Sequence, residues 1–227
     1  MSVIIAPDYY KEFHCLAGEC RHSCCEGWEI DIDEESLNKY EKMPGIAEHI
    51  SREGVPHFML KGSRCPFLKE DNLCELICSY GEDILCQICR DHPRFRNFWT
   101  GRVEIGLGLA CEEAARIILG RKEPMKLVVL ESDGEDVPLP EDEQWLMDLR
   151  QSMLDSVEGD GPDARLLEYL IYRHIADALY DDRLEERIAF IQESYDAVLD
   201  EWDKTDGSLE ALAECARKFS AEKEYVE

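Results

Sequence analysis

Cysteine is the residue type through which this sequence is best equipped to do chemistry. Ten of its 11 cysteines lie between Cys15 and Cys111. They form tight groups: Cys15, Cys20, Cys24 and Cys25, then Cys65, Cys74, Cys78, Cys86 and Cys89, then Cys111. Cysteines that only fill a core behave as small hydrophobes and are scattered along a chain. The clustering therefore indicates sulfurs that share either a metal centre or a disulfide network.

The sequence favours metal ligation over disulfides. The N-terminal residues lack the basic start and long apolar stretch of a signal peptide, and no apolar run approaches membrane-spanning length. We therefore expect a cytoplasmic protein without membrane contact, whose thiols stay reduced. In a reducing compartment a dense cysteine pattern predicts bound metal or an iron–sulfur cluster. An odd number of cysteines also leaves one thiol unpaired in any scheme made only of disulfides.

The spacing of the cysteines shows which of them could share one centre. Zinc and a [4Fe–4S] cluster each take four ligands drawn from two or more loops, so spacing alone does not separate them. The strongest local pair is Cys86 and Cys89, because two cysteines three positions apart can both reach one ion. Cys20 and Cys24 are nearly as good. Cys24 and Cys25 are adjacent and so seldom serve one tetrahedral ion together.

A second candidate site follows the cysteines. Glu104, Gly106 and Gly108 precede a helix, and an acidic residue with spaced glycines is typical of nucleotide and S-adenosylmethionine sites. The alternative is a hairpin strand that ends in a ligand cysteine, and it is favoured because further strand–helix units are missing. Arg94 lies near Cys89, where its charge could offset an anionic thiolate centre or hold a carboxylate or phosphate.

Short elements must position the cysteines. We predict a strand from Trp28 to Ile32 that leads into a helix near Asp33, and a turn at Asp71-Asn72. A short helix starts at Gly81-Glu82-Asp83, carries Leu85, Cys86 and Cys89, and ends at His92-Pro93. The segments Phe95–Trp99 and Arg102–Leu107 form a hairpin, and Cys111 opens a helix that Gly120 closes.

From about Pro140 the sequence changes character. Apolar residues recur at three- and four-residue steps in four stretches, which predicts four amphipathic helices joined by short loops. A single strand is expected before them, at Lys126–Leu130. The expected fold is therefore α+β and mainly helical: a cysteine-rich metal-binding module with short hairpins over residues 1–125, followed by an acidic helical bundle over residues 126–227.

The charge of the chain excludes one class of partner. The net charge is −26, from 51 acidic and 25 basic side chains, and residues 131–227 contribute −20 of it. Such a surface repels nucleic acid and anionic membranes. The acidic half is either a solvated helix surface or a surface that attracts a basic partner, such as a lysine-rich substrate protein.

Several motifs in the first 120 residues together resemble the flagellin lysine-N-methylase family, which is related to zinc- or iron-chelating proteins with a CxxCxxCC-type pattern. They are Pro7-Asp8-Tyr9-Tyr10, Phe13-x-Cys15, Cys20-x3-Cys24-Cys25-x2-Trp28-x-Ile30, Arg64-Cys65-Pro66-Phe67-Leu68, Leu73-Cys74, Cys89-x3-Pro93-Arg94 and Cys111-x2-Ala114-Ala115-Arg116. Glu112 departs from the pattern, because the family usually has a proline after this cysteine.

The resemblance implies methyl transfer from S-adenosylmethionine to lysine side chains of flagellin, with an iron–sulfur cluster (4Fe-4S), zinc or another metal held by cysteines. By that match the metal ligands are Cys15, Cys20, Cys24, Cys25, Cys65, Cys74, Cys89 and Cys111, which leaves Cys78, Cys86 and Cys215 as extras. The predicted contacts of the methyl donor are Arg94, Glu104, Gly106 and Gly108. A neutral amine nucleophile needs a base, for which Glu104 and Tyr80 are candidates. The alternative function is a non-catalytic zinc- or iron-binding module.

Overall fold

The computed structural model describes residues 3–132, 134, 137–181 and 183–223. The chain divides into two compact units. The first, here called the cysteine unit, is Cys15–His92, and the second, the helical unit, combines Met1–His14 with Pro93–Glu227. The predicted module over residues 1–125 thus contains the whole cysteine unit together with segments that belong to the helical unit.

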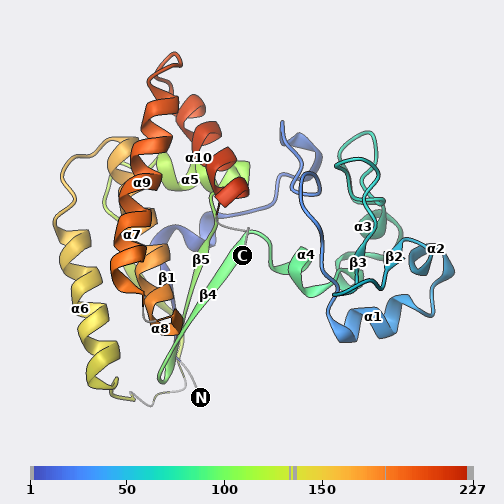
Figure 1. The fold of residues 1–227 in the computed structure, drawn as a ribbon, viewed down its shortest axis with the longest axis horizontal. Coiled ribbons are helices and arrows are strands. Elements are labelled where there is room, and N and C mark those ends of the chain that lie inside the picture. Colours follow the sequence, from blue (N-terminus) through green and yellow to red (C-terminus); the bar gives the residue numbers. More distant parts are fainter. Residues whose placement is uncertain (1–2, 133, 135–136, 182, 224–227) are drawn as a thin grey trace. The chain divides into compact units, whose positions relative to one another are not determined.

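A four-stranded sheet organises the helical unit (Figure 1). Its order is β4 (Arg94–Trp99), β5 (Arg102–Leu107), β1 (Val3–Pro7) and β6 (Leu127–Glu131). β4 and β5 are antiparallel, with Trp99 opposite Arg102, which confirms the predicted hairpin. β1 runs parallel to β5 and antiparallel to β6. The first strand of the chain therefore fills the centre of a sheet whose other strands begin about 90 residues later.

Helices supply most of the helical unit. They are η1 (Asp8–Glu12), α5 (Glu112–Leu119), α6 (Glu141–Asp155), α7 (Pro162–His174), η4 (Ile175–Asp177), α8 (Ala178–Asp181), α9 (Leu184–Trp202) and α10 (Leu209–Lys223). The helix after Cys111 and the four predicted C-terminal helices are confirmed, and α8 is additional. α7 contacts α5, α6, α9 and α10, so it lies at the centre of the helix packing (Figure 1).

The core of the helical unit joins its helices to its sheet. Leu166 and Leu170 of α7 are buried together with Ile118 of α5, Leu212 of α10 and Leu107 of β5. Each such side chain stabilises the fold by roughly 1.5–3 kcal/mol relative to an exposed position. Most of the apolar steps read from the sequence are thus core packing, whereas Trp145 and Ile188 are exposed.

The cysteine unit is built from short elements. They are η2 (Ala17–Glu19), α1 (Glu34–Tyr40), α2 (Pro44–Ala47), β2 (Ile50–Ser51), β3 (His57–Phe58), α3 (Glu75–Tyr80), η3 (Glu82–Ile84) and α4 (Gln87–Asp91). β2 and β3 pair in an antiparallel ladder. The core contains Tyr40, Phe58 and Phe67 and, with them, the thiols of Cys65 and Cys86.

Two predictions for this unit need correction. Trp28–Ile32 is not a regular strand, because its pairing with the segment around the two-residue β3 is limited to scattered contacts: Asp31 pairs with His57 as an isolated bridge, Phe58 N donates to Ile30 O, and Ile32 N donates to Pro56 O. The single helix expected between Gly81-Glu82-Asp83 and His92-Pro93 is divided into η3 and α4, since Leu85 is extended and Cys86 caps the second segment. The helix that begins near Asp33 is confirmed.

Within the described part of the chain, no helix combines the length and the apolar character that crossing a bilayer requires.

Candidate functional site

Backbone pairing brings the first and second cysteine groups together. The amide of Cys65 donates to the carbonyl of Cys25 at 2.9 Å, and Gly27 N donates to Ser63 O at 2.8 Å. Glu26 and Arg64, between these two bonds, form a bridge and an ion pair at 3.4 Å. Segments almost 40 residues apart are thereby fixed side by side.

A tight turn places Cys74 next to Cys65. Leu68 and Cys74 pair as a bridge, and Glu75 N donates to Phe67 O at 2.8 Å. Asn72 adopts a φ of 60° in this turn, a left-handed conformation that asparagine tolerates better than most residues. The turn predicted at Asp71-Asn72 is therefore present, and it ends at Cys74, the residue that caps α3.

Asp33 fixes the position of Cys86 and Cys89. Its Oδ1 accepts from Ser36 N at 3.0 Å, which caps α1. Its Oδ2 accepts from Gln87 N at 2.8 Å, at the first residue of α4. One carboxylate thus satisfies unpaired amides at the start of two helices, and the second helix carries Cys86 at its cap and Cys89 on its body.

The thiols of two cysteine pairs are hydrogen bonded. A hydrogen bond with Cys25 lowers the pKa of Cys24 to about 7, whereas the same contact and burial raise the pKa of Cys25. Likewise, the hydrogen bond with Cys89 lowers the pKa of Cys86. One sulfur in each pair therefore loses its proton more readily than an ordinary cysteine, and thiolates are the form that binds metals.

These cysteines also influence one another across the unit. Burial raises the pKa of Cys65 to about 11, and the charges of Cys74 and Cys86 add to this effect. The hydrogen bond with Cys86 and burial raise the pKa of Cys89, and the charges of Cys25 and Cys65 add to this effect. The structure thus gathers six sulfurs into one electrostatic group, here called the thiol cluster: Cys24, Cys25, Cys65, Cys74, Cys86 and Cys89.

The other predicted ligands lie in different settings. Cys15 is exposed, its sulfur accepts from Ala17 N, and Cys20 follows η2. Cys111 caps α5 in the helical unit. Conversely, Cys86 belongs to the thiol cluster but is absent from the ligand set that the resemblance implies. Its spacing from Cys89 is the sequence signal that could have found it.

The thiol cluster has the chemistry of a metal site but not the geometry of a formed one. All its members are free thiols. Among the described residues, no group of three or more histidine, cysteine, aspartate or glutamate side chains is arranged to hold a metal ion. Six soft sulfur donors in a partly buried setting nonetheless match the preferences of zinc and of iron–sulfur clusters.

Glu104, a predicted donor contact and base, is held in a buried ion pair. Arg150 of α6 donates to both carboxylate oxygens, at 2.6 and 2.7 Å, and Trp99 Nε1 donates to one of them at 3.0 Å. The side chains of Glu104 and Arg150 are 1% and 2% exposed. Both oxygens of Glu104 thus have partners inside the fold.

The neighbouring candidate residues are placed by packing. Phe95 covers Gly106 so closely that a Cβ at this glycine would lie 2.2 Å from Phe95 Cζ. Gly108 N donates to Pro93 O at 2.6 Å. The guanidinium of Arg94 lies over the rings of Phe13 and Tyr10, at 5.3 and 5.9 Å. Packing within the fold is a sufficient reason for this glycine at position 106.

Tyr80, the other candidate base, lies at the end of α3 in the cysteine unit and is 57% exposed. Its side chain is accessible to a protein partner, unlike that of Glu104.

Comparison with known proteins finds relatives that include two proteins named for lysine methylation. The chain is 28% identical over 162 residues to proteins named Lysine-N-methylase from Salmonella choleraesuis (strain SC-B67) and from Salmonella typhimurium (strain LT2). It is 26% identical over 137 residues to the flagellar biosynthetic protein FliU of Salmonella muenchen. These matches confirm the resemblance to the flagellin lysine-N-methylase family.

The coverage of these matches is unequal. The matches to the two lysine-N-methylases cover 64% of this chain but only 40% of each of those proteins. The match to FliU covers 55% of this chain and 81% of FliU. The chain therefore corresponds to about two fifths of the length of its first two relatives. No family model matches the sequence, and no solved structure matches it.

Proposed function

We propose that this chain takes part in S-adenosylmethionine-dependent N-methylation of lysine side chains in flagellin. The observation that carries the proposal is the similarity to two proteins named Lysine-N-methylase over 64% of the chain. The thiol cluster supports it, because it lies within the part of the sequence that carries the family motifs.

The thiol cluster is our proposed binding site for an iron–sulfur cluster or zinc. Cys24, Cys25, Cys65, Cys74 and Cys89 would hold the group, and Cys86 joins them because its thiol contacts that of Cys89. When bound, iron–sulfur supplies a redox-active centre and zinc a fixed positive charge. The protein contributes deprotonated thiols and the backbone contacts that hold their loops together.

The proposed reaction joins a lysine nitrogen to the methyl carbon of the donor. The new N–C bond forms as the C–S bond of the sulfonium breaks, so that S-adenosylhomocysteine leaves and the amine releases a proton. The exposed Tyr80 suits a base for that proton better than Glu104, whose oxygens Arg150 occupies. Arg94, Gly106 and Gly108 stay predicted contacts of the donor.

The acidic composition supports a basic protein as the substrate. Residues 131–227 carry 29 acidic and 9 basic side chains. A field of this sign raises the local concentration of a lysine-rich partner, and the effect weakens as salt is added.

Methyl transfer to recombinant flagellin tests this function. Protein purified without oxygen is mixed with flagellin and methyl-labelled S-adenosylmethionine, and peptide mass spectrometry locates labelled lysines. We expect label on flagellin with the unmodified protein and a strong loss with Cys89→Ala. Cys215→Ala, at a half-buried position on α10 outside the thiol cluster, is the matched control and should retain activity.

A non-catalytic metal-binding module is the second candidate. The observation that favours it is the 40% coverage of the lysine-N-methylases, since the remaining 60% of those proteins has no counterpart in the match. Calorimetry separates the two functions. Heat from S-adenosylmethionine binding to metal-loaded protein supports the methylase, whereas metal binding without such heat supports the module.

A further inference from the structure

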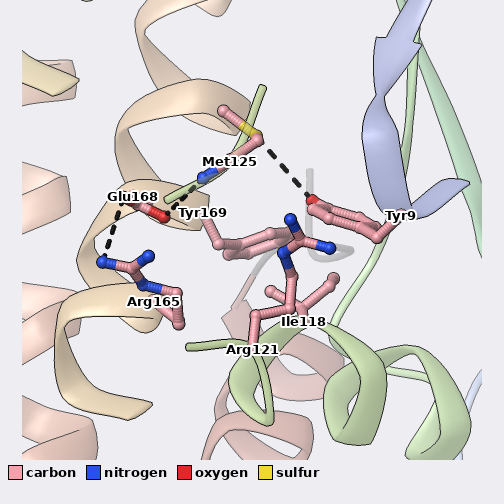
Figure 2. A pocket seen from close by; sticks show the side chains of 7 residues that line it. All are labelled: Tyr9, Ile118, Arg121, Met125, Arg165, Glu168 and Tyr169. Atoms are coloured by element: carbon pink, nitrogen blue, oxygen red, sulfur yellow. Dashed lines mark hydrogen bonds and ion pairs between the residues drawn. The ribbon is translucent and has the colours of Figure 1, made fainter. Parts of the chain in front are cut away.

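A small cavity in the helical unit is lined by none of the cysteines of the thiol cluster and by none of the predicted donor contacts (Figure 2). The rings of Tyr9 and Tyr169 and the side chains of Ile118 and Met125 form its apolar wall. The Tyr9 hydroxyl faces the Met125 sulfur at 3.9 Å. The space admits a group about the size of a water molecule and is partly open to solvent.

Two arginines and Glu168 complete the lining of this cavity. Figure 2 shows the guanidinium of Arg121 between the rings of Tyr9 and Tyr169, and that of Arg165 near Glu168. The Arg165 side chain is 1% exposed and that of Arg121 is 16% exposed. Two positive charges are therefore held largely out of water beside an enclosed space.

Hydrogen bonds and ion pairs within the fold use only some of the N–H groups of these two arginines. Arg121 Nη2 donates to Asp8 at 2.9 Å. Arg165 Nη2 donates to the carbonyl of Gly159 at 3.1 Å and lies 3.2 Å from Glu168 Oε1. Glu168 Oε2 is engaged with the amide of Met125. Arg121 Nη1 lies 3.8 Å from Glu12 Oε1. The ion pairs thus draw on Nη1 and Nη2 of Arg121 and on Nη2 of Arg165.

Three buried guanidinium nitrogens of the described residues are left without an acceptor: Arg121 Nε, Arg165 Nε and Arg165 Nη1. A buried donor without a partner costs about 1–3 kcal/mol, and more on a charged group. Such atoms are rare in native proteins and point to an unseen partner that accepts hydrogen bonds.

We propose that this cavity binds a small anion through Arg121 and Arg165. A water molecule has two lone pairs, which is one fewer than the donors that need an acceptor, and its own hydrogens would need acceptors in turn. Chloride, or one oxygen of a carboxylate or phosphate, accepts from several N–H groups and gains from both positive charges. The space fits one such atom, so a larger anion would leave its remainder at the open side.

Thermal unfolding at constant ionic strength tests anion binding in solution. Sodium gluconate, the bulkiest of the anions used, is replaced stepwise by chloride, acetate or phosphate, with the same metal content in every sample. A ligand that binds only the folded state raises the melting temperature in a saturating way. We expect this rise with at least one anion. Comparison of the three series identifies whether chloride, a carboxylate or phosphate binds.

Variants assign the effect to the cavity. Arg165→Gln should abolish the rise, and the double change to Arg165→Gln with Glu168→Gln should do the same without leaving a buried carboxylate unpaired. Arg183→Gln changes an arginine whose side chain is 57% exposed, and it should retain the full rise. Equal responses in all variants would overturn the proposal.

Crystals of the unmodified protein grown in bromide give an answer that needs no variant. Anomalous scattering should place a bromide within hydrogen-bonding distance of Arg165 Nε and Nη1. A water molecule at this position, together with identical melting curves in all the salts, would exclude an anion site. Because neither measurement involves methyl transfer, failure here leaves the proposed function untouched.

Discussion

At the scale of single residues, the buried pair of Glu104 and Arg150 decides between two roles for Glu104. Removing one member of a buried ion pair costs about 3–5 kcal/mol, because the other charge is left without a partner. We therefore expect Glu104→Gln to lower the free energy of unfolding in urea by about 3 kcal/mol.

Replacing both members separates the structural role from a role in donor binding. The double variant Glu104→Leu with Arg150→Met removes both charges at similar volume, and such replacements are often neutral or stabilising. It should recover most of the stability that Glu104→Gln loses. If the recovered protein binds S-adenosylmethionine as the unmodified protein does, Glu104 is not a donor contact; a loss of that binding would restore Glu104 to the donor site.

The ionisation of Asp177 should make the stability of the helical unit depend on pH. Burial by itself raises the pKa of this carboxyl, but the contact with His174 and the charges of two nearby arginines outweigh burial and lower the pKa. His174 Nδ1 lies 3.3 Å from Asp177 Oδ2, and Arg173 donates to Oδ1 at 2.9 Å. Together these contacts link the end of α7 to η4.

We expect Asp177→Asn to destabilise the protein most at neutral pH. A lowered pKa in the folded state means that the ionised carboxylate stabilises the fold above the unfolded pKa of about 3.9, and that this stability is lost as the pH falls through the folded pKa. The variant should lose about 1.5 kcal/mol at pH 7, the value typical of a hydrogen bond to a charged group. Urea unfolding at several pH values should show this difference shrinking below pH ~4; a constant difference would contradict it.

The sequence predicted one pair of cysteines within the thiol cluster, but not which six cysteines make up the cluster. The spacing of Cys86 and Cys89 marked them as one pair, and the structure keeps their thiols in contact. The resemblance left Cys86 out. Sequence could not show that Asp33, more than 50 residues away, would fix the cap at Cys86, because that contact depends on how α1 and α4 pack.

At the scale of elements, the β4–β5 hairpin depends on the absence of a side chain at Gly106. Phe95, its register partner on β4, fills the space that a Cβ would need. Gly106→Ala should therefore displace the Phe95 ring and lower the free energy of unfolding by about 1–3 kcal/mol, the usual cost of overpacking. The double variant Gly106→Ala with Phe95→Leu should regain part of the lost free energy of unfolding.

Chemical denaturation of the two variants measures both effects. A Gly106→Ala protein of unchanged stability would show that the ring moves freely and that the glycine serves another purpose, such as the close approach of a ligand. Thr100→Ala, which removes a hydroxyl bound to Glu143 at the turn of the same hairpin, is a control for general weakening of this element.

Elements with a clear period were predicted, as was the short apolar strand β6, whereas β1 and α3 were missed. The amphipathic helices α6, α7, α9 and α10 carry regular apolar steps, so their sequences specify them. β1 has a continuous apolar run over five residues, VIIAP, and its partners β5 and β6 lie about 100 residues or more away. α3 is a six-residue helix that Cys74 begins, too short for a period to be read.

At the scale of the whole molecule, the boundary between the two units is set by long-range pairing. Residues 3–7 join a sheet with residues 94–107 and 127–131, so the helical unit encloses the sequence of the cysteine unit. The change in character of the sequence from about Pro140 suggested a simpler division, into residues 1–125 and 126–227. Composition could not reveal this one, because the parallel pairing of β1 with β5 leaves no local mark in the sequence.

Because each unit has its own core, metal removal should affect them unequally. The core of the cysteine unit includes Cys65 and Cys86, whereas the helical unit packs around α7 without any member of the thiol cluster. Metal binding adds its free energy to the folded state only where the ligands lie. A chelator should therefore destabilise residues 15–92 and leave the helical unit close to its starting stability.

Hydrogen exchange followed by mass spectrometry measures this difference along the chain. After chelation we expect amide exchange to become at least tenfold faster in α1 and α4 and to stay unchanged in α7 and α9. A tenfold increase corresponds to a loss of about 1.4 kcal/mol in the free energy of local opening. Cys86→Ala without chelator should reproduce the pattern, since it removes a sulfur from the same group, and Cys215→Ala should not. Equal acceleration in both units would mean that they unfold together, and no acceleration anywhere would mean that the thiols hold no metal that stabilises the fold.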